Sequence, residues 1–317
     1  MRVAVLDDYL DVVREVADWD SLPEGVEVTV FNDHLTDEDA LVERLAGFDI
    51  IVATRERTPF PRALLERLPG LKLLVAGGRH SRKIDIDAAL EQGIVVTGTR
   101  KFGAAACELT WGLILALLRH IAQEDAALRA GRWHYALGRA LSDKTLGLVG
   151  LGNIGAEMAA VAKAFAMNVI AWSQNLTAER AAELGVERVG KHDLFRRADI
   201  VSIHLALGER SIGVIGAAEL SLMKPTAYFI NTARGPIVDE AALIDMLENR
   251  RIAGCALDVF DQEPLPADHP LRRVDNTILT PHIGYVTDGT FEAYYRSAVE
   301  SIEAYVKGDP VPYAIEG

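Results

Sequence analysis

Hydrophobic residues in the first hundred positions occur in short runs separated by amphipathic stretches. The runs predict five β-strands, at Val3–Leu6, Val26–Phe31, Ile50–Ala53, Leu71–Ala76 and Ile94–Thr97. The amphipathic stretches predict four helices between them, at Tyr9–Ala17, Asp37–Ala46, Pro61–Arg67 and Asp85–Gln92. Strands that alternate with helices in this way predict a parallel sheet covered by helices on both faces.

The same alternation resumes in the second half of the chain. Six further strands are expected, at Thr145–Val149, Asn168–Trp172, Ile200–His204, Tyr228–Asn231, Ala253–Val259 and Thr277–Thr280, with helices between them. Between the two halves, residues 104–130 carry leucines at helical spacing and predict one long core helix that bridges the two domains, although exposed apolar residues there could also serve a dimer contact. A last helix, Asp288–Lys307, has no strand of its own and is expected to pack on the first domain.

A glycine-rich turn stands at the start of the second half, between the strand that ends at Val149 and an Ala-rich helix. Its glycines are Gly150, Gly152 and Gly155, with Asn153 and Ile154 opening the helix. In a turn of this kind the first glycine permits the tight bend, the second allows a pyrophosphate to approach, and the third lets helix and strand pack closely. Because the strand–turn–helix setting is present, the turn predicts a dinucleotide-binding site.

Composition narrows the class of protein. The 317 residues are half hydrophobic, enough for about two globular domains. A formal net charge of -13 disfavours binding to nucleic acid or to an anionic membrane, and it is most simply a solubility feature. No apolar run approaches the roughly 20 residues of a membrane span, and the first residues predict a strand rather than a signal peptide.

The two cysteines, Cys107 and Cys255, fall in a predicted helix and a predicted strand. Two buried thiols are therefore expected rather than a disulfide, which favours a reducing cytoplasmic compartment.

Three segments with polar residues follow predicted strands in the second half. Arg234 comes just after the strand that ends at Asn231, Asp258 and Glu263 come at and after the next strand, and His282 follows the last one. Open α/β sheets bind ligands at the carboxyl ends of their strands, so these side chains are expected to face one crevice. Each of these residues alone has an ordinary structural explanation. Together, in a chain with a dinucleotide-binding turn, they indicate a catalytic site.

The chemistry that this set suits is hydride transfer. Reduction of a carbonyl by NAD(P)H needs a proton donor for the developing alkoxide, and an imidazole is the usual choice. A carboxylate partner favours the imidazolium and fixes which ring nitrogen faces the substrate. An arginine can clamp a substrate carboxylate through two hydrogen bonds. His282, Glu263 and Arg234 meet these three requirements.

Over nearly its whole length the chain resembles the D-isomer-specific 2-hydroxyacid dehydrogenase family, through GLVGLGNIG, INTARGPIVDEAAL, ALDVFDQEPLP and TPHIGY. The resemblance implies that Arg234 binds the substrate carboxylate, that His282 is the acid/base with Glu263 as its partner, and that Asp258 orients the nicotinamide carboxamide. It places further cofactor contacts at His204, Thr232, Ala233, Arg234, His282 and Gly284.

The resemblance also implies a homodimer and an α/β fold of two doubly wound parallel-sheet domains. A Rossmann nucleotide-binding domain, residues 101–284, would be inserted into a flavodoxin-like catalytic domain formed by residues 1–100 and 285–317. The chain would then cross between the domains twice.

Two segments depart from the family pattern. Where the family has a glycine-rich loop that holds the substrate carboxylate, this chain has Gly78-Arg79-His80-Ser81-Arg82-Lys83. Gly78, Arg79 and His80 are the candidate substrate-binding residues of this segment. The segment is either a re-formed loop whose charges are simply solvated or a pocket adapted to an unusual or more anionic substrate.

The second departure concerns the cofactor. An acidic residue that grips the ribose hydroxyls of NAD is expected about 20 residues after the glycines, but Ser173, Gln174 and Asn175 stand there. These residues could hydrogen-bond the 2′-phosphate of NADP, although no arginine is adjacent in the sequence. The pattern slightly favours NADP(H) over NAD(H).

The leading hypothesis is an NAD(P)-dependent D-2-hydroxyacid dehydrogenase that works as a 2-ketoacid reductase on small acids such as glyoxylate or hydroxypyruvate. The alternatives are a dinucleotide-sensing interaction protein on the same fold and a dehydrogenase of another small acid such as phosphite. No metal site is expected.

Overall fold

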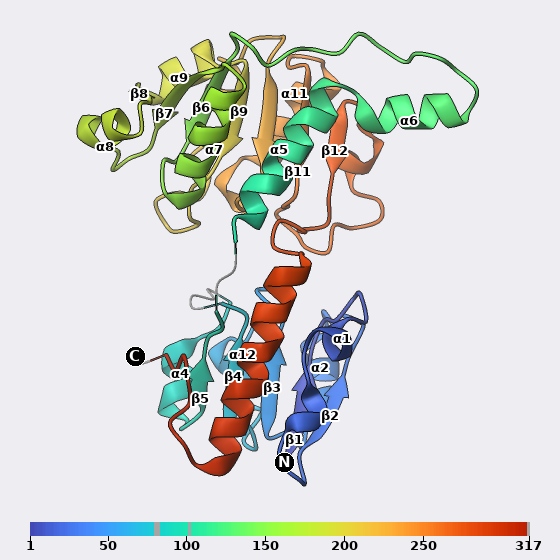
Figure 1. Cartoon of the computed structure of the whole chain (residues 1–317), viewed down its shortest axis with the longest axis vertical. Coiled ribbons are helices and arrows are strands. Elements are labelled where there is room, and N and C mark those ends of the chain that lie inside the picture. The colour runs from blue at the N-terminus through green and yellow to red at the C-terminus, as the bar shows by residue number, and fades with distance from the viewer. Residues whose placement is uncertain (79–82, 101–102, 316–317) are drawn as a thin grey trace. The chain divides into compact units, whose positions relative to one another are not determined.

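The structure is a computed structural model, and it describes residues 1–78, 83–100 and 103–315 of the chain. The chain divides into two compact units, one formed by Met1–Gly103 with Val286–Gly317 and the other by Ala104–Tyr285. Each unit is an α/β body with its own parallel sheet (Figure 1).

The first unit contains a five-stranded parallel sheet with the strand order β2-β1-β3-β4-β5. Its strands are β1 Arg2–Val5, β2 Glu27–Val30, β3 Ile50–Ala53, β4 Leu73–Ala76 and β5 Val95–Thr97. This order is that of flavodoxin-like folds, and its topological switch point lies between β1 and β3. The flavodoxin-like architecture expected from the sequence is confirmed.

Helices cover both faces of this sheet. They are α1 Val13–Val16, α2 Glu38–Leu45, α3 Arg62–Glu66, α4 Ile86–Glu91 and α12 Asp288–Lys307, with a 3-10 turn at Trp19–Ser21. The core that α2, α3 and α4 share with the sheet includes Leu45, Leu64 and Ala88, all buried. Helix α12 packs on α1 and β4 of this unit, which confirms the expected placement of the last helix.

The second unit contains a seven-stranded parallel sheet with the strand order β12-β11-β10-β9-β6-β7-β8. Its strands are β6 Thr145–Val149, β7 Asn168–Trp172, β8 Glu187–Arg188, β9 Ile200–Ile203, β10 Tyr228–Asn231, β11 Gly254–Leu257 and β12 Thr277–Leu279. The direction in which strands are added reverses between β6 and β9, which is the switch point where a doubly wound fold binds its ligand.

The helices of the second unit also form two layers. They are α5 Ala105–Leu118, α6 Ile121–Arg129, α7 Asn153–Ala164, α8 Ala178–Glu183, α9 Lys191–Arg197, α10 Ala217–Leu220 and α11 Glu240–Glu248, with 3-10 turns at Gly235–Ile237 and Pro270–Arg273. Helices α5, α7 and α8 share one core, and α9, α10 and α11 share the other.

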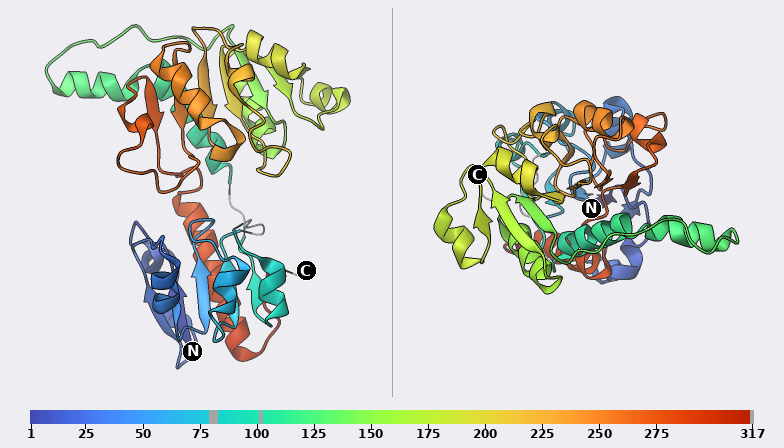
Figure 2. Two further views of the ribbon diagram at one scale, coloured as in Figure 1. Left: turned by 180° about the vertical axis from the view of Figure 1, so that it is seen from behind. Right: turned by 90° about the horizontal axis from the view of Figure 1, so that it is seen from above.

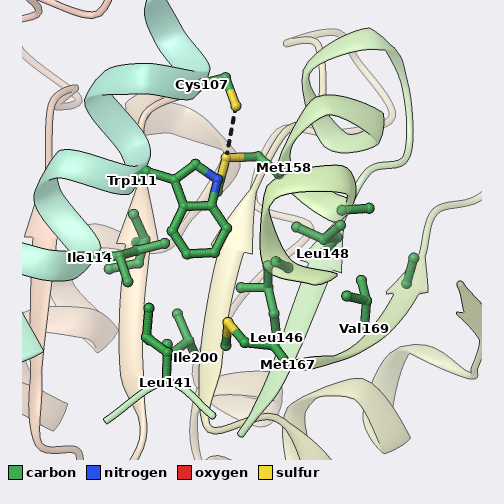
Figure 3. Close-up of a cluster of buried hydrophobic side chains, with 14 of the residues drawn as sticks. Cys107, Trp111, Ile114, Leu141, Leu146, Leu148, Met158, Met167, Val169 and Ile200 are labelled. Atoms are coloured by element: carbon green, nitrogen blue, oxygen red, sulfur yellow. Dashed lines mark hydrogen bonds between the residues drawn. The ribbon is translucent and has the colours of Figure 1, made fainter. Parts of the chain in front are cut away.

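Trp111 of α5 lies in the first of these cores beside Met158 of α7 (Figure 3). Both cysteines are buried free thiols, as expected, and Cys107 contacts the Met158 sulfur at 3.4 Å.

The prediction of one long helix over residues 104–130 is wrong, because the structure has two helices with a 57° bend between them. His120 causes the break: its φ of 53° is left-handed, which no helix continues through. Helix α6 and the loop after it project from the body of the second unit (Figures 1 and 2).

Among the described residues no single helix is long and apolar enough to cross a membrane. Helices α5 and α6 reach the required length and composition only as a pair, across their bend.

Two other local differences have clear causes. The helix expected over Tyr9–Ala17 is reduced to Val13–Val16, because Asp7 and Asp11 have positive φ values and Asp8 accepts hydrogen bonds from the backbone N–H groups of Val12 and Val13. Strand β8 was not expected, because it is two residues long, polar and exposed and so carries no apolar pattern.

Candidate active site

The glycine turn after β6 has the geometry that a dinucleotide site needs. Gly150 has a φ of 106°, and a Cβ atom there would lie 2.6 Å from the His204 carbonyl oxygen. A Cβ on Gly155 would lie 2.3 Å from the carbonyl oxygen of Gly150, so only glycine lets the helix start this close to the turn. Gly152 by contrast faces open space.

Helix α7 begins directly at this turn. No side chain caps its N-terminus at Gly152, and its first turn contains no acidic residue. Asn153 and Ile154 are its first two residues, so their backbone N–H groups stand at the positive end of a 12-residue helix. The arrangement fits a pyrophosphate group, which the helix N-terminus and the open side of Gly152 can accept.

The loops after β11 and β12 bring Glu263 and His282 together. Nδ1 of His282 lies 2.6 Å from Oε2 of Glu263, and both side chains are about a quarter exposed, at 25% and 26%. The other carboxylate oxygen of Glu263 accepts the backbone N–H of Phe260 at 2.9 Å. Because that N–H fixes the carboxylate, Glu263 orients the imidazole and leaves Nε2 as the ring nitrogen available to a substrate.

Asp258, just after β11, fastens the segment that carries His282. Its fully buried carboxylate accepts hydrogen bonds from the Thr280 hydroxyl at 2.6 Å and from the backbone N–H groups of Ile283 and Gly284 at 2.8 Å each. Burial raises the pKa of Asp258, although these three donors act in the opposite direction. The His282 backbone between them is left-handed, with a φ of 53°.

Arg234 lies on the loop after β10, and buried Asn231 shapes that loop. The Asn231 side chain accepts the N–H of Ala233 and donates to the carbonyl of Arg234, both at 3.0 Å. Arg234 itself donates from Nη1 to the Ala233 carbonyl at 2.6 Å. A Cβ on Gly235 would lie 2.1 Å from the Phe260 carbonyl carbon, so this loop runs against the one that holds Glu263.

Thr232, a predicted cofactor contact, forms a hydrogen bond that the sequence did not predict. Its hydroxyl lies 2.7 Å from that of Thr110, a fully buried residue of α5. Helix α5 is therefore hydrogen-bonded, through Thr110, to the loop that carries Arg234. Thr110 sits inside an apolar helical pattern, and nothing in the sequence signals this contact.

His204 follows β9 beside the glycine turn. Its Nε2 atom lies 2.9 Å from the hydroxyl of Ser202, and desolvation lowers the pKa of His204 to about 4. The imidazole is therefore neutral at physiological pH.

Ser173, Gln174 and Asn175 follow β7 as expected, with Gln174 and Asn175 exposed and Ser173 half-buried. The Gln174 amide donates to the backbone carbonyl of Arg210 at 2.9 Å, which brings a distant arginine to this strand end.

In the first unit, Gly78 has a φ of 102°, and its N–H donates to the Thr99 hydroxyl at 2.7 Å. The other two expected substrate residues, Arg79 and His80, lie outside the described residues.

These side chains can perform acid–base chemistry beside a bound dinucleotide. The loops that carry Arg234, Glu263 and His282 follow the adjacent strands β10, β11 and β12, on the sheet whose β6 leads into the glycine turn. The imidazole can exchange a proton, and the guanidinium can bind a carboxylate.

Comparison with known proteins agrees with this interpretation. Residues 111–284 match the model of the NAD binding domain of D-isomer specific 2-hydroxyacid dehydrogenases. The chain is 39% identical to a glyoxylate reductase from Aeropyrum pernix over 78% of its own length and 77% of that protein.

Two further similar proteins have names that refer to phosphoglycerate. The chain is 38% identical to a D-3-phosphoglycerate dehydrogenase from Methanocaldococcus jannaschii over 87% of its length, although it spans only 53% of that longer protein. A crystal structure of a phosphoglycerate oxidoreductase from Vibrio cholerae o395 superposes with a TM-score of 0.92 at 37% identity, covering 97% of this chain and 99% of the other. The chain therefore belongs to the D-isomer-specific 2-hydroxyacid dehydrogenase family, a family of oxidoreductases that act on CH–OH groups with a nicotinamide cofactor.

Proposed function

We propose that this protein reduces small 2-ketoacids such as glyoxylate or hydroxypyruvate to D-2-hydroxyacids. The observation that carries the proposal is the His282–Glu263 pair at 2.6 Å, held by Phe260 and beside a segment fastened by Asp258. A protein that only sensed a dinucleotide would not need such a pair. A glyoxylate reductase and a hydroxypyruvate reductase among the relatives support this substrate class.

Separate groups of residues would bind the cofactor and the substrate. The glycine turn and the α7 N-terminus would hold the cofactor pyrophosphate, with Gly152, Asn153 and Ile154 nearest to it. When bound, the nicotinamide supplies or accepts the hydride at C2 of the acid. Arg234 would bind the substrate carboxylate through two hydrogen bonds and so orient the neighbouring carbonyl.

His282 would deliver the proton from Nε2 to the carbonyl oxygen as the alkoxide develops, and would take it back in the oxidation direction. Glu263 would hold the ring by Nδ1 and stabilise the imidazolium. Asp258 would position His282 indirectly. It accepts hydrogen bonds from the backbone N–H groups of Ile283 and Gly284, the two residues that follow His282. The sequence also assigned Asp258 to the nicotinamide carboxamide, and we retain that contact as a proposal.

The direct test is steady-state reduction of glyoxylate, hydroxypyruvate, pyruvate and bulkier 2-ketoacids by wild type and by His282→Asn. The variant should retain cofactor affinity but lose at least about a hundredfold in kcat, the usual contribution of a positioned acid. Near-normal turnover by the variant would remove His282 from the reaction, and turnover of phosphite but no ketoacid would give the enzyme another substrate.

For the cofactor, we propose a preference for NADP(H). Ser173 stands where an NAD-dependent enzyme carries a carboxylate, so the 2′-phosphate meets no like charge there. A ratio of kcat/KM for NADPH over NADH below one in the wild type would contradict this preference.

We further propose that the protein is a homodimer in a reducing cytoplasmic compartment. Helix α6 and its following loop expose a run of large apolar side chains, Ile121, Leu128, Trp133, Tyr135 and Leu137. Trp133 is 79% exposed and Leu137 is 94% exposed, which a contact with a second copy would relieve. The compartment is supported by the two free, buried cysteines.

A further inference from the structure

The residues that follow strand β7 provide no positive charge for the 2′-phosphate of NADP(H). Ser173, Gln174 and Asn175 can donate hydrogen bonds to a phosphate, but none of them carries a positive charge. The chain as a whole has a formal net charge of -13, so a phosphate monoester approaches an unfavourable background potential. A 2′-phosphate would need a cation from elsewhere in the fold.

A hydrogen bond between two loops brings the backbone of an arginine to this strand end. Nε2 of Gln174 donates to the backbone carbonyl of Arg210 at 2.9 Å, although 36 residues separate them in the sequence. Gln174 follows β7 and Arg210 belongs to the loop after β9, and these strands flank β6 on its two sides. The hydrogen bond therefore joins the two loops that border the glycine turn after β6.

The Arg210 loop holds a defined shape through its own contacts. The Ser211 hydroxyl accepts the N–H of Gly208 at 2.8 Å and lies 2.8 Å from the carbonyl of Ala206. The N–H of Ile212 also donates to the Gly208 carbonyl at 3.1 Å. The backbone of Arg210 is thus fixed from within its loop as well as by Gln174.

Three other basic residues lie near the end of β7, and each has a partner. Arg180 pairs with Glu183 at 3.2 Å, and Lys191 pairs with buried Glu219 at 2.6 Å. Arg188 donates from Nε to the carbonyl of Leu176 at 2.7 Å.

Arg210 differs from Arg180 and Lys191, which are ion-paired, and from Arg188, whose guanidinium is hydrogen-bonded to a backbone carbonyl. Its residue is exposed, and no carboxylate of the described chain lies within ion-pair distance of its guanidinium. Its neighbour Glu209 is the other charged residue between Leu205 and Ile212, so any attraction of this loop for an anion comes from Arg210.

We propose that Arg210, together with Ser173 and Gln174, forms the subsite for the 2′-phosphate of NADP(H). The guanidinium would bind the phosphate oxygens through two charge-assisted hydrogen bonds. The Ser173 hydroxyl would donate a further bond at the strand end, and Gln174 would keep the Arg210 loop in place. The inference rests on the proposed cofactor preference and names the residue that produces it.

The test separates recognition of the phosphate from catalysis. Isothermal titration calorimetry measures the Kd of 2′,5′-ADP and of 5′-AMP for the wild type, Arg210→Ala, Arg210→Lys and Gln174→Leu. Arg196→Ala is the matched control, because Arg196 is an exposed arginine of the same unit that pairs with Asp193. Thermal melting of each variant verifies that it folds.

The wild type should bind 2′,5′-ADP at least about tenfold more tightly than 5′-AMP, which corresponds to about 1.4 kcal/mol. Arg210→Ala should abolish this difference while the Kd of 5′-AMP changes little. Arg210→Lys should restore part of it, since lysine keeps the charge without the forked geometry. Gln174→Leu should give an intermediate loss, and Arg196→Ala should behave as wild type.

An unchanged ratio in Arg210→Ala would overturn the assignment, and so would a wild type that binds both nucleotides equally. Neither result depends on turnover. A failure of this subsite therefore remains distinct from a failure of the proposed reductase activity, which the ketoacid assay measures separately.

Discussion

Replacement of Glu263 by glutamine tests the proposed acid–base pair with a minimal change of shape. In the wild type, Oε1 accepts the Phe260 N–H at 2.9 Å and Oε2 faces Nδ1 of His282 at 2.6 Å. Glutamine can keep only one oxygen. If that oxygen stays on the Phe260 N–H, the new NH₂ group faces Nδ1 and donates to it, which leaves the neutral ring with its proton on Nε2. The variant thus loses the counter-charge and reverses the tautomer.

The size of the effect follows from the geometry. Two unit charges about 4 Å apart attract by about 4 kcal/mol at an effective dielectric constant of about 20. Because both side chains are a quarter exposed, the lower value for a hydrogen bond to a charged group is the better guide, about 1.5–3 kcal/mol. A loss of that size in the transition state lowers the rate by about 10- to 150-fold.

The assay is steady-state turnover with saturating cofactor, followed by nicotinamide absorbance in both directions. An enzyme cannot change the equilibrium of its reaction, so kcat/KM should fall for ketoacid reduction and for hydroxyacid oxidation alike. The chain offers a matched control in Glu240→Gln, because Glu240 pairs with His269 at 3.0 Å in a similarly buried setting of the same unit. Its glutamine variant should behave as wild type.

Two results would refute this reasoning. Near-normal kcat/KM in Glu263→Gln would show that the pair is structural. An equal loss in Glu240→Gln would show that any broken His–Glu pair disturbs the unit, and that His282 has no special part.

Three further predictions concern other parts of the molecule. Arg234→Lys should raise the KM for 2-ketoacids strongly, because lysine keeps the charge but not the two-pronged carboxylate contact; unchanged KM and kcat would place Arg234 outside the pocket. His204 stays neutral in the folded protein down to about pH 4, whereas the unfolded chain takes up this proton below about pH 6.5. The free energy of unfolding should therefore fall between those pH values by roughly 3 kcal/mol at most from this group. Chemical denaturation of His204→Gln should show a weaker fall than the wild type, and an equal fall in both proteins would contradict this prediction. Trp133→Asp should convert the proposed dimer to a monomer in analytical ultracentrifugation, and a variant that remains dimeric would exclude this surface.

The sequence predicted best where the pattern is local. The strand–glycine–helix sequence around Gly150 specifies a turn that depends only on neighbouring residues, and both sheets follow from regular alternation. The pairing of Glu263 with His282 was also predicted, because residues that follow adjacent parallel strands meet at one edge of the sheet. The catalytic roles of Arg234, Glu263 and His282 stay predictions until they are measured.

The remaining features depend on loops that meet across the fold. Arg210 lies 36 residues from Gln174, and no periodic pattern indicates which loops will touch above a sheet. The break at His120 also escapes prediction, since the apolar spacing continues past a residue whose left-handed backbone ends the helix. Thr110 is hidden for a related reason: a hydroxyl within an apolar helix does not show which partner it faces.

The left-handed backbone at His282 limits what substitutions there can reveal. With a φ of 53°, the position disfavours most side chains regardless of chemistry, at about 1–2 kcal/mol for an L-residue, whereas asparagine visits this conformation readily. A β-branched replacement would combine the loss of the imidazole with a displaced Ile283–Gly284 segment and a weakened Asp258 contact. Libraries that randomise position 282 will therefore rank residues by backbone tolerance as well as by proton transfer, and residues that tolerate the left-handed region, such as asparagine, separate the two.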